Sequence, residues 1–119
     1  MDWLRMLRSE TAQRLILNHQ KQQPVKGTPD EIDFPPVCKL FVPWAAGTWL
    51  LTEMDEDGLA FGLCDIGHQC PELGHVSLDE LWGIKGPGGL RVEEDIHFRS
   101  DEPISKWATR SREQGYINA

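Results

Sequence analysis

The stretch KLFVPWAAGTWLLTEMDEDGLAFGLCDI, residues 39–66, consists of three apolar runs separated by the connection PWAAG and the acidic segment DEDG. Short runs rich in β-branched and aromatic residues, bounded by turn residues, are typical of β-strands. The pattern predicts a hairpin or meander step from Val37 to Met54, a turn at Asp55 to Gly58, and a third strand in LAFGLCDI. The order of the strands in the sheet stays open.

A short helix is predicted after this strand region and a further extended piece, LGHV. Ser77 and Glu80 in SLDELWGI match the capping box S-x-x-E, in which each side chain satisfies a free backbone amide of the other. We expect the helix to run from about Leu78 to Ile84 and to end before the glycine-rich turn KGPGGL.

The run RVEEDIHF alternates between apolar and polar residues. Val92, Ile96 and Phe98 fall on one face, which predicts a half-exposed strand near a sheet edge. A C-terminal helix is expected next, with Ser100 or Asp101 as its N-cap and Gly115 at its end.

The first 23 residues have apolar side chains at helical spacing and contain neither proline nor glycine. They form either one helix or two, with Ser9 or Thr11 capping the second. Residues 24–36 form a proline-containing linker, and residues 37–119 form the core domain. Together these elements predict an α+β fold: a small, mostly antiparallel sheet with an N-terminal helix, a short central helix and a C-terminal helix.

The length and composition indicate a single folded domain that does not span a membrane. A chain of 119 residues is sufficient for one domain with its own core. Its longest apolar run falls well short of the roughly 20 residues that span a bilayer, and MDWLRMLRSETAQ lacks the apolar region of a signal peptide. We therefore expect a cytoplasmic protein that does not enter membranes, with its three cysteines reduced.

The formal net charge of −7 is unevenly distributed. Residues 28–102 contain four Lys/Arg against sixteen Asp/Glu, whereas residues 1–27 and 103–119 are mildly basic. An acidic body repels phosphate backbones, so direct binding of nucleic acid by the middle segment is disfavoured. The acidic surface serves either to keep the protein soluble or to imitate nucleic acid toward a basic partner.

Four segments resemble a bacterial family of small proteins of unknown function that is common on plasmids, phages and integrated mobile elements. The resemblance covers a little over half the chain and rests on KLFVPWAAGTWLLTE, AFGLCDIG, PELGHVSLDEL and DIHF, in that order. It implies no mechanism. Because the family usually has tyrosine at the position of His75 and often lacks Cys70, a metal site using both would be specific to this protein.

A zinc site is one hypothesis for AFGLCDIGHQCPELGH, since thiolate and imidazole are ligands that Zn²⁺ prefers. The candidate ligands are Cys64, His68, Cys70 and His75. Their spacing, C-x3-H-x-C-x4-H, is not that of a common zinc knuckle. In the alternative interpretation Cys64 is a buried apolar side chain, Cys70 a turn thiol, and the histidines are surface residues. We expect no cofactor, with structural zinc as the alternative.

A small enzyme or ligand-binding domain is a second hypothesis. His75 would act as base, with Asp65 or Glu72 orienting it. Ser77 is already assigned to a helix cap, and the chain has no G-x-S-x-G, H-E-x-x-H, P-loop or dinucleotide motif.

Protein binding is the function that we expect instead, for a non-enzymatic accessory or host-interaction protein of a mobile genetic element. Exposed aromatic residues often anchor protein interfaces. Trp44, at the tip of PWAAGTW, is the first candidate anchor, and Asp65, Glu72 and His75 are further candidate binding residues. The sequence identifies neither the partner nor the oligomeric state.

Overall fold

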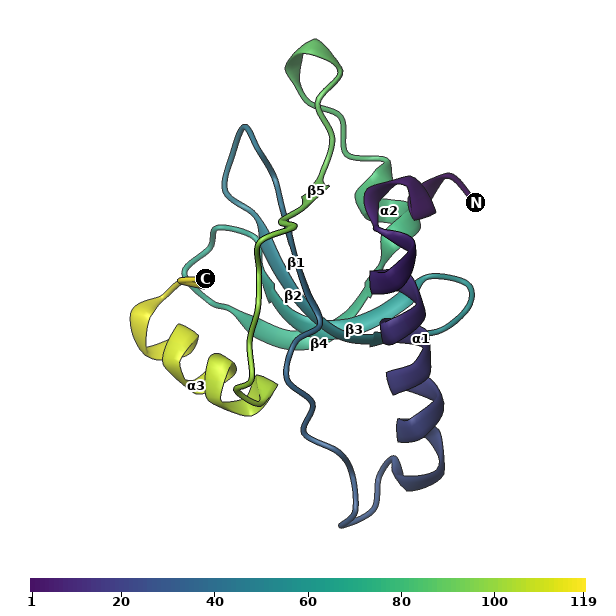
Figure 1. The fold of residues 1–119 in the computed structure, drawn as a ribbon. Coiled ribbons are helices and arrows are strands. Elements are labelled where there is room, and N and C mark those ends of the chain that lie inside the picture. Colours follow the sequence, from purple (N-terminus) through teal and green to yellow (C-terminus); the bar gives the residue numbers. More distant parts are fainter.

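The protein, described here over residues 1–119 by a computed structural model, is built on one five-stranded antiparallel sheet (Figure 1). The strand order is β4-β3-β2-β1-β5, so the first four strands form a meander and the last strand returns to pair with β1. The strands are β1 (Cys38–Phe41), β2 (Thr48–Met54), β3 (Leu59–Asp65), β4 (Glu72–Ser77) and β5 (Glu93–Glu94). The predicted α+β class is confirmed.

Helices lie on both faces of the sheet, with α1 and α2 on one side and α3 on the other (Figure 1). None of them is both long and apolar enough to pass through a bilayer. The α-helices are α1 (Ser9–Gln22), α2 (Leu78–Trp82) and α3 (Ile104–Gln114), and the 3₁₀-helices are η1 (Asp2–Met6), η2 (Gln23–Val25) and η3 (Pro87–Gly89).

The N-terminal region therefore contains two successive helices, because Leu7 has extended backbone angles that end η1. Helix α1 starts at Ser9, with Arg8 in the N-cap position. Neither Ser9 nor Thr11 caps it, since no side chain at the N-cap position bonds to the helix. Glu94, from the distant strand β5, takes that role instead: its carboxylate accepts a hydrogen bond from the N–H of Arg8.

Two hydrophobic cores lie on opposite faces of the sheet. The larger packs α1, η1 and α2 onto one face and includes the fully buried Leu15, Leu51 and Met54. The smaller packs α3 onto the other face, where Trp107 lies with Leu50 and Leu63. Because Leu50 and Leu51 alternate between the faces, β2 is buried on both sides, which explains its nearly continuous apolar sequence.

An irregularity in β2 changes which way its last residues point. The pairing with β3 shifts between Leu51 and Glu53, so Thr52 is an extra residue in the manner of a β-bulge. Glu53 consequently pairs with Phe61, on the face that α3 covers, and Met54 points toward α1. Without the bulge, strand alternation would place Glu53 on the face toward α1 and Met54 on the face that α3 covers.

The predicted turns of the meander are confirmed. Asp55 Oδ1 accepts hydrogen bonds from the backbone N–H groups of Asp57 and Leu59, both at 2.9 Å, and Gly58 takes a positive φ of 86°. An aspartate that bonds to its own following backbone is a common turn device. The strand that follows, β3, ends at Asp65, close to the predicted boundary.

The long strand predicted in RVEEDIHF is wrong except at Glu93 and Glu94, the two residues of β5. Val92 and Phe98 are buried as expected, but Ile96 is 52% exposed. Asp95 Oδ1 accepts a hydrogen bond of 2.9 Å from the backbone N–H of His97, and this turn ends β5. A side chain that bonds to nearby backbone offers an alternative to the strand ladder, and here it prevails.

The central and C-terminal helices differ from prediction at their boundaries. Of the predicted capping box, only half is present: Ser77 Oγ accepts from the N–H of Glu80 at 3.3 Å, no bond joins the Glu80 side chain to the Ser77 N–H, and α2 ends at Trp82. Helix α3 ends at Gly115, as predicted, but neither Ser100 nor Asp101 caps its start. Its cap is Asp33, which accepts from both the backbone and the hydroxyl of Ser105.

Candidate binding groove

A groove of about 730 Å³ lies where the N-terminus, α2 and the chain around β5 come together. Its walls come from η1 and the two residues after it, from Trp82 at the end of α2, and from residues 89–96. These segments are far apart in the sequence, so the groove exists only in the folded chain. Its volume is within the range of about 300–1,000 Å³ that is common for binding sites.

Trp82 lies at the centre of the basic part of the groove. The guanidinium carbon of Arg91 is 4.1 Å from the centroid of the indole ring, and that of Arg5 is 5.6 Å away. Arginine is attracted to the negative face of an indole ring at such distances. Arg91 also donates a hydrogen bond to the carbonyl of Trp82, which fixes its orientation.

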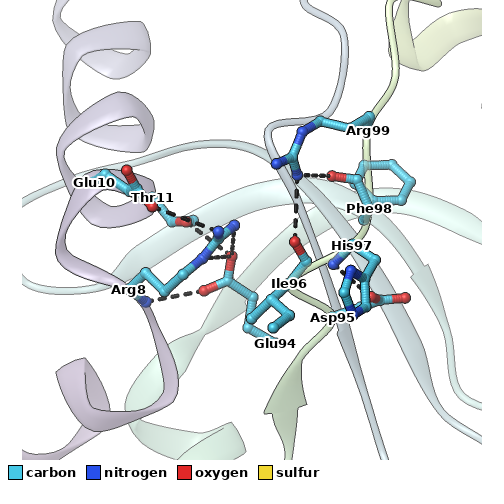
Figure 2. Close-up of polar contacts among 9 residues, drawn as sticks. All are labelled: Arg8, Glu10, Thr11, Glu94, Asp95, Ile96, His97, Phe98 and Arg99. Carbon is cyan, nitrogen blue, oxygen red and sulfur yellow. Dashed lines mark hydrogen bonds and ion pairs between the residues drawn. The ribbon is translucent and has the colours of Figure 1, made fainter.

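Glu94 joins β5 to the start of α1 (Figure 2). Its Oε1 accepts from the backbone N–H of Arg8 at 2.9 Å, and its Oε2 accepts from Arg8 Nη2 at 3.0 Å and from the Thr11 hydroxyl at 2.8 Å. The Glu94 side chain is only 4% exposed, so this network replaces the water that a carboxylate otherwise needs. The bond from Glu94 raises the pKa of Arg8 above its ordinary value.

The remaining walls are apolar and exposed. Leu90 is 40% exposed and Ile96 is 52% exposed, and both line the groove with the half-buried Trp82. Arg99 donates to the carbonyls of Ile96 and Phe98 (Figure 2). These bonds stabilise the turn in which the Ile96 side chain points away from the core. The groove therefore presents apolar side chains beside cationic groups.

Charge distinguishes the groove from the rest of the molecule. Its lining includes three arginines and two glutamates, whereas the whole chain has a net charge of −7. Of the glutamates, Glu94 is already neutralised by Arg8. Arg5 and Arg91 form no ion pair with a carboxylate of the protein. The groove is thus a local cationic site on an acidic protein.

Among the residues predicted to form a site, Asp65 has a structural role. It is 8% exposed, and its Oδ1 accepts from the N–H of Gly67 while its Oδ2 accepts from the N–H of Ile117, both at 3.0 Å. The carboxylate thereby ties the end of β3 to the chain that follows α3. Both oxygens are occupied by the protein itself.

Asp65, Glu72 and His75 do not come together. His75 pairs with Phe61 across β3 and β4, and their rings meet edge to face with centroids 5.2 Å apart. Four residues of strand, roughly 13 Å, separate Phe61 from Asp65. Glu72 is three positions from His75 on the same strand, so the two side chains point to opposite faces of the sheet.

The four candidate metal ligands are also separated. Cys64 pairs with Glu72 on the face toward α1, whereas His75 is on the opposite face. His68 is exposed, and the exposed Cys70 thiol donates to Glu72 at 3.4 Å. Nowhere in the chain do three or more His, Cys, Asp or Glu side chains gather closely enough to hold a metal ion.

Trp44 is half-buried rather than fully exposed. Its ring lies against the backbone of Gly86, where an added Cβ would be 2.5 Å from the indole. This contact joins the tip of the β1–β2 hairpin to the turn KGPGGL, which is itself closed by a bond from Gly86 N–H to the Leu90 carbonyl. Trp44 therefore supports the loop that carries one wall of the groove.

Comparison with known proteins gives a family for nearly the whole chain. A family model described as "Protein of unknown function (DUF2958)" matches residues 6–118. The chain belongs to the DUF2958 family. The DUF2958 match includes α1, the sheet and α3, and every residue that lines the groove except Arg5. No curated protein and no solved structure matches the chain.

Sequence reasoning missed the residues that form the groove in this DUF2958 protein. One signal was present for Glu94: it is two positions after Val92 in an alternating run, so it occupies the inward face of the strand. A charged residue at an inward position needs a partner. Nothing local indicated that this partner would be Arg8, which is 86 positions away.

Proposed function

We propose that the protein is a non-enzymatic accessory or host-interaction protein of a mobile genetic element, and that it acts by binding another protein through the groove around Trp82. The observation that carries the proposal is that two guanidinium groups without a carboxylate partner, those of Arg5 and Arg91, lie beside the indole. Tryptophan and arginine are the residue types most enriched at the energetic centres of protein interfaces. The resemblance to proteins of plasmids and phages supports the association with mobile elements.

The lining of the groove indicates the chemistry of the partner. Arg5 and Arg91 fit carboxylates, which arginine binds with paired hydrogen bonds. Leu90 and Ile96 add exposed apolar surface that a leucine or aromatic side chain would cover. The partner segment therefore contains acidic residues next to an apolar anchor. The positive potential of the groove speeds the association of this segment, and added salt weakens the complex.

A peptide titration tests the proposed site. The probe is an acetylated peptide with alternating glutamate and leucine, and its control has glutamine in place of each glutamate. We expect the acidic peptide to shift the NMR signal of the Trp82 indole N–H and to bind at least about tenfold more tightly than the neutral peptide. Equal binding of the two peptides would remove the basis of the proposal.

Matched variants test whether the acidic peptide binds in the groove. Arg91→Gln removes a groove cation and should weaken the acidic peptide about tenfold, whereas Arg112→Gln removes an exposed cation of α3 outside the groove and should change nothing. In cells, a photo-crosslinking residue at position 90 should capture a partner that one at the exposed Gln13 does not. Capture that survives Arg91→Gln unchanged would contradict the role of the groove.

A further inference from the structure

A second cavity, of about 320 Å³, lies away from the groove on the α3 side of the molecule. The end of α1, the crossing segment around residues 31–34, the start of α3 and the sheet form its walls. A smaller pocket of about 150 Å³ adjoins it. The two cavities share four lining residues: Lys26, Glu53, Phe61 and His75. No residue lines both this cavity and the groove around Trp82.

Glu53 is the chemically distinctive residue of this cavity. The bulge in β2 turns it toward Phe61, and it is only 7% exposed. Its Oε2 lies 3.2 Å from Nδ1 of His19, but no hydrogen bond or ion pair of the protein reaches its Oε1. No buried side-chain oxygen of the protein lacks a hydrogen-bond partner, so Oε1, which accepts none, is in contact with solvent in the cavity. A cationic ligand that donates a hydrogen bond to Oε1 would replace that solvent with a charge-assisted bond.

The other charged groups of the cavity favour a cation. Glu31 and Asp33 also line it, against the single exposed lysine Lys26. Asp33 is occupied by Ser105, and Glu31 accepts from the N–H of Gly27 at 3.3 Å. Lys26 forms no ion pair with Glu53. The lining thus has an excess of negative charge, and Oε1 of the largely buried Glu53 accepts no hydrogen bond from the protein.

The remaining walls suit an apolar body attached to that cation. Phe34 and Phe61 contribute aromatic rings, and Leu73 and Ile104 contribute aliphatic surface. An aromatic face attracts an organic cation in addition to covering its apolar part. His75, which lines the cavity through its position beside Phe61, adds a polar edge.

We propose that this cavity binds an organic cation, an ammonium or guanidinium group on a short apolar body, with Glu53 Oε1 as its counter-ion. The cation lies between the sheet and the crossing segment, and its body contacts Phe34 and Phe61. Such a group is present in free amines and guanidines and also in the lysine and arginine side chains of other proteins. Both sources offer the same chemistry to Glu53.

The first test compares two probes of the same shape on the wild-type protein. Benzamidinium is a cation, and benzamide is its neutral counterpart. We expect benzamidinium to shift the backbone NMR signals of Glu53, Phe61 and Phe34, and to bind at least about tenfold more tightly than benzamide. The comparison needs no variant, so it does not depend on how a substitution affects folding. Equal binding of the two probes would overturn the proposal.

The second test uses a matched pair of variants. Glu53→Gln removes the buried charge, and Glu56→Gln removes an exposed charge that lines neither cavity. Affinity for benzamidinium should fall at least about tenfold in the first variant and stay unchanged in the second. Affinity that stays unchanged in folded Glu53→Gln would refute the assignment of the counter-ion.

Two further probes distinguish the sources of the cation. Butylguanidinium represents a free small molecule, and acetyl-Gly-Arg-Gly-amide represents an arginine side chain on a protein. Binding of both supports an occupant supplied by a partner chain. Binding of butylguanidinium alone supports a free amine or guanidine as the occupant. In that case the crossing segment leaves no room for the peptide backbone that an arginine side chain carries. Failure of every cation to bind at millimolar concentration contradicts the proposal.

Discussion

Replacing Glu94 by alanine removes one carboxylate that accepts four hydrogen bonds from Arg8 and Thr11. The substitution removes the carboxylate that accepts from the N–H of Arg8 at the start of α1, and it opens one wall of the groove. We expect a clear loss of stability, although Glu94 is not itself one of the apolar residues of either hydrophobic core. The effect comes from polar groups that lose their partner while they remain partly buried.

The magnitude follows from the exposure of each group. Thr11 is 2% exposed, so its hydroxyl loses a partner that water does not replace, at a cost of about 1–3 kcal/mol. The loss of the cap on the Arg8 N–H adds about 1 kcal/mol. The Arg8 side chain is 37% exposed and is rehydrated, so the broken ion pair adds little. The free energy of unfolding should fall by about 2–4 kcal/mol.

Urea denaturation followed by tryptophan fluorescence and by circular dichroism measures this change. The control is Glu93→Ala, an exposed neighbour on the same strand, which should stay within about 0.5 kcal/mol of the wild type. A double-mutant cycle of Glu94→Ala with Thr11→Val should show coupling of about 1 kcal/mol or more. If the two glutamate variants are equally stable, or if the cycle shows no coupling, the account of the network is wrong.

Two further predictions concern the sheet and its thiols. Gly62→Ala would place a Cβ in collision with the carbonyl oxygen of Leu50 and should destabilise the fold by about 3 kcal/mol or more, whereas Gly74→Ala on the neighbouring strand meets no atom within 4 Å and should be nearly neutral in the same urea assay. Equal effects would contradict the close approach of the strands. The hydrogen bond to Glu72 raises the pKa of Cys70, so less thiolate is present at a given pH than in a free cysteine. Glu72→Gln should move the pH profile of iodoacetamide alkylation, followed by mass spectrometry, to lower pH, and an unmoved profile would contradict this cause.

The sequence predicted those parts of the fold that depend on neighbouring residues. The meander from β1 to β3 was visible because its strands are apolar and its turns contain Asp55 and Gly58, whose own chemistry forms the turn. The end of α3 was visible for the same reason, since Gly115 takes the left-handed conformation, with φ at 84°. In both cases the decisive interactions lie within a few residues of each other.

Interactions across the chain escaped prediction. Asp33 caps a helix that begins more than seventy residues later, and Ser100 and Asp101, although suitable by type, do not. Asp65 had the chemistry of a site residue, yet the structure uses it to hold the chain after α3. Side-chain type alone does not separate these roles, because the same carboxylate can bind a ligand, cap a helix or tie two segments together.

The network at Glu94 also bears on how the chain acquires its structure during synthesis. Arg8 leaves the ribosome early, but its acceptor follows 86 residues later, which takes roughly 4–17 s at synthesis rates of about 5–20 residues per second. During that interval the first turn of α1 lacks its charged cap, and the arginines of the future groove have no fixed geometry. Contacts between such distant residues also slow folding in a complete chain. The groove around Trp82 is therefore among the last parts of the protein to form, and a nascent chain that ends before residue 94 lacks one of its walls.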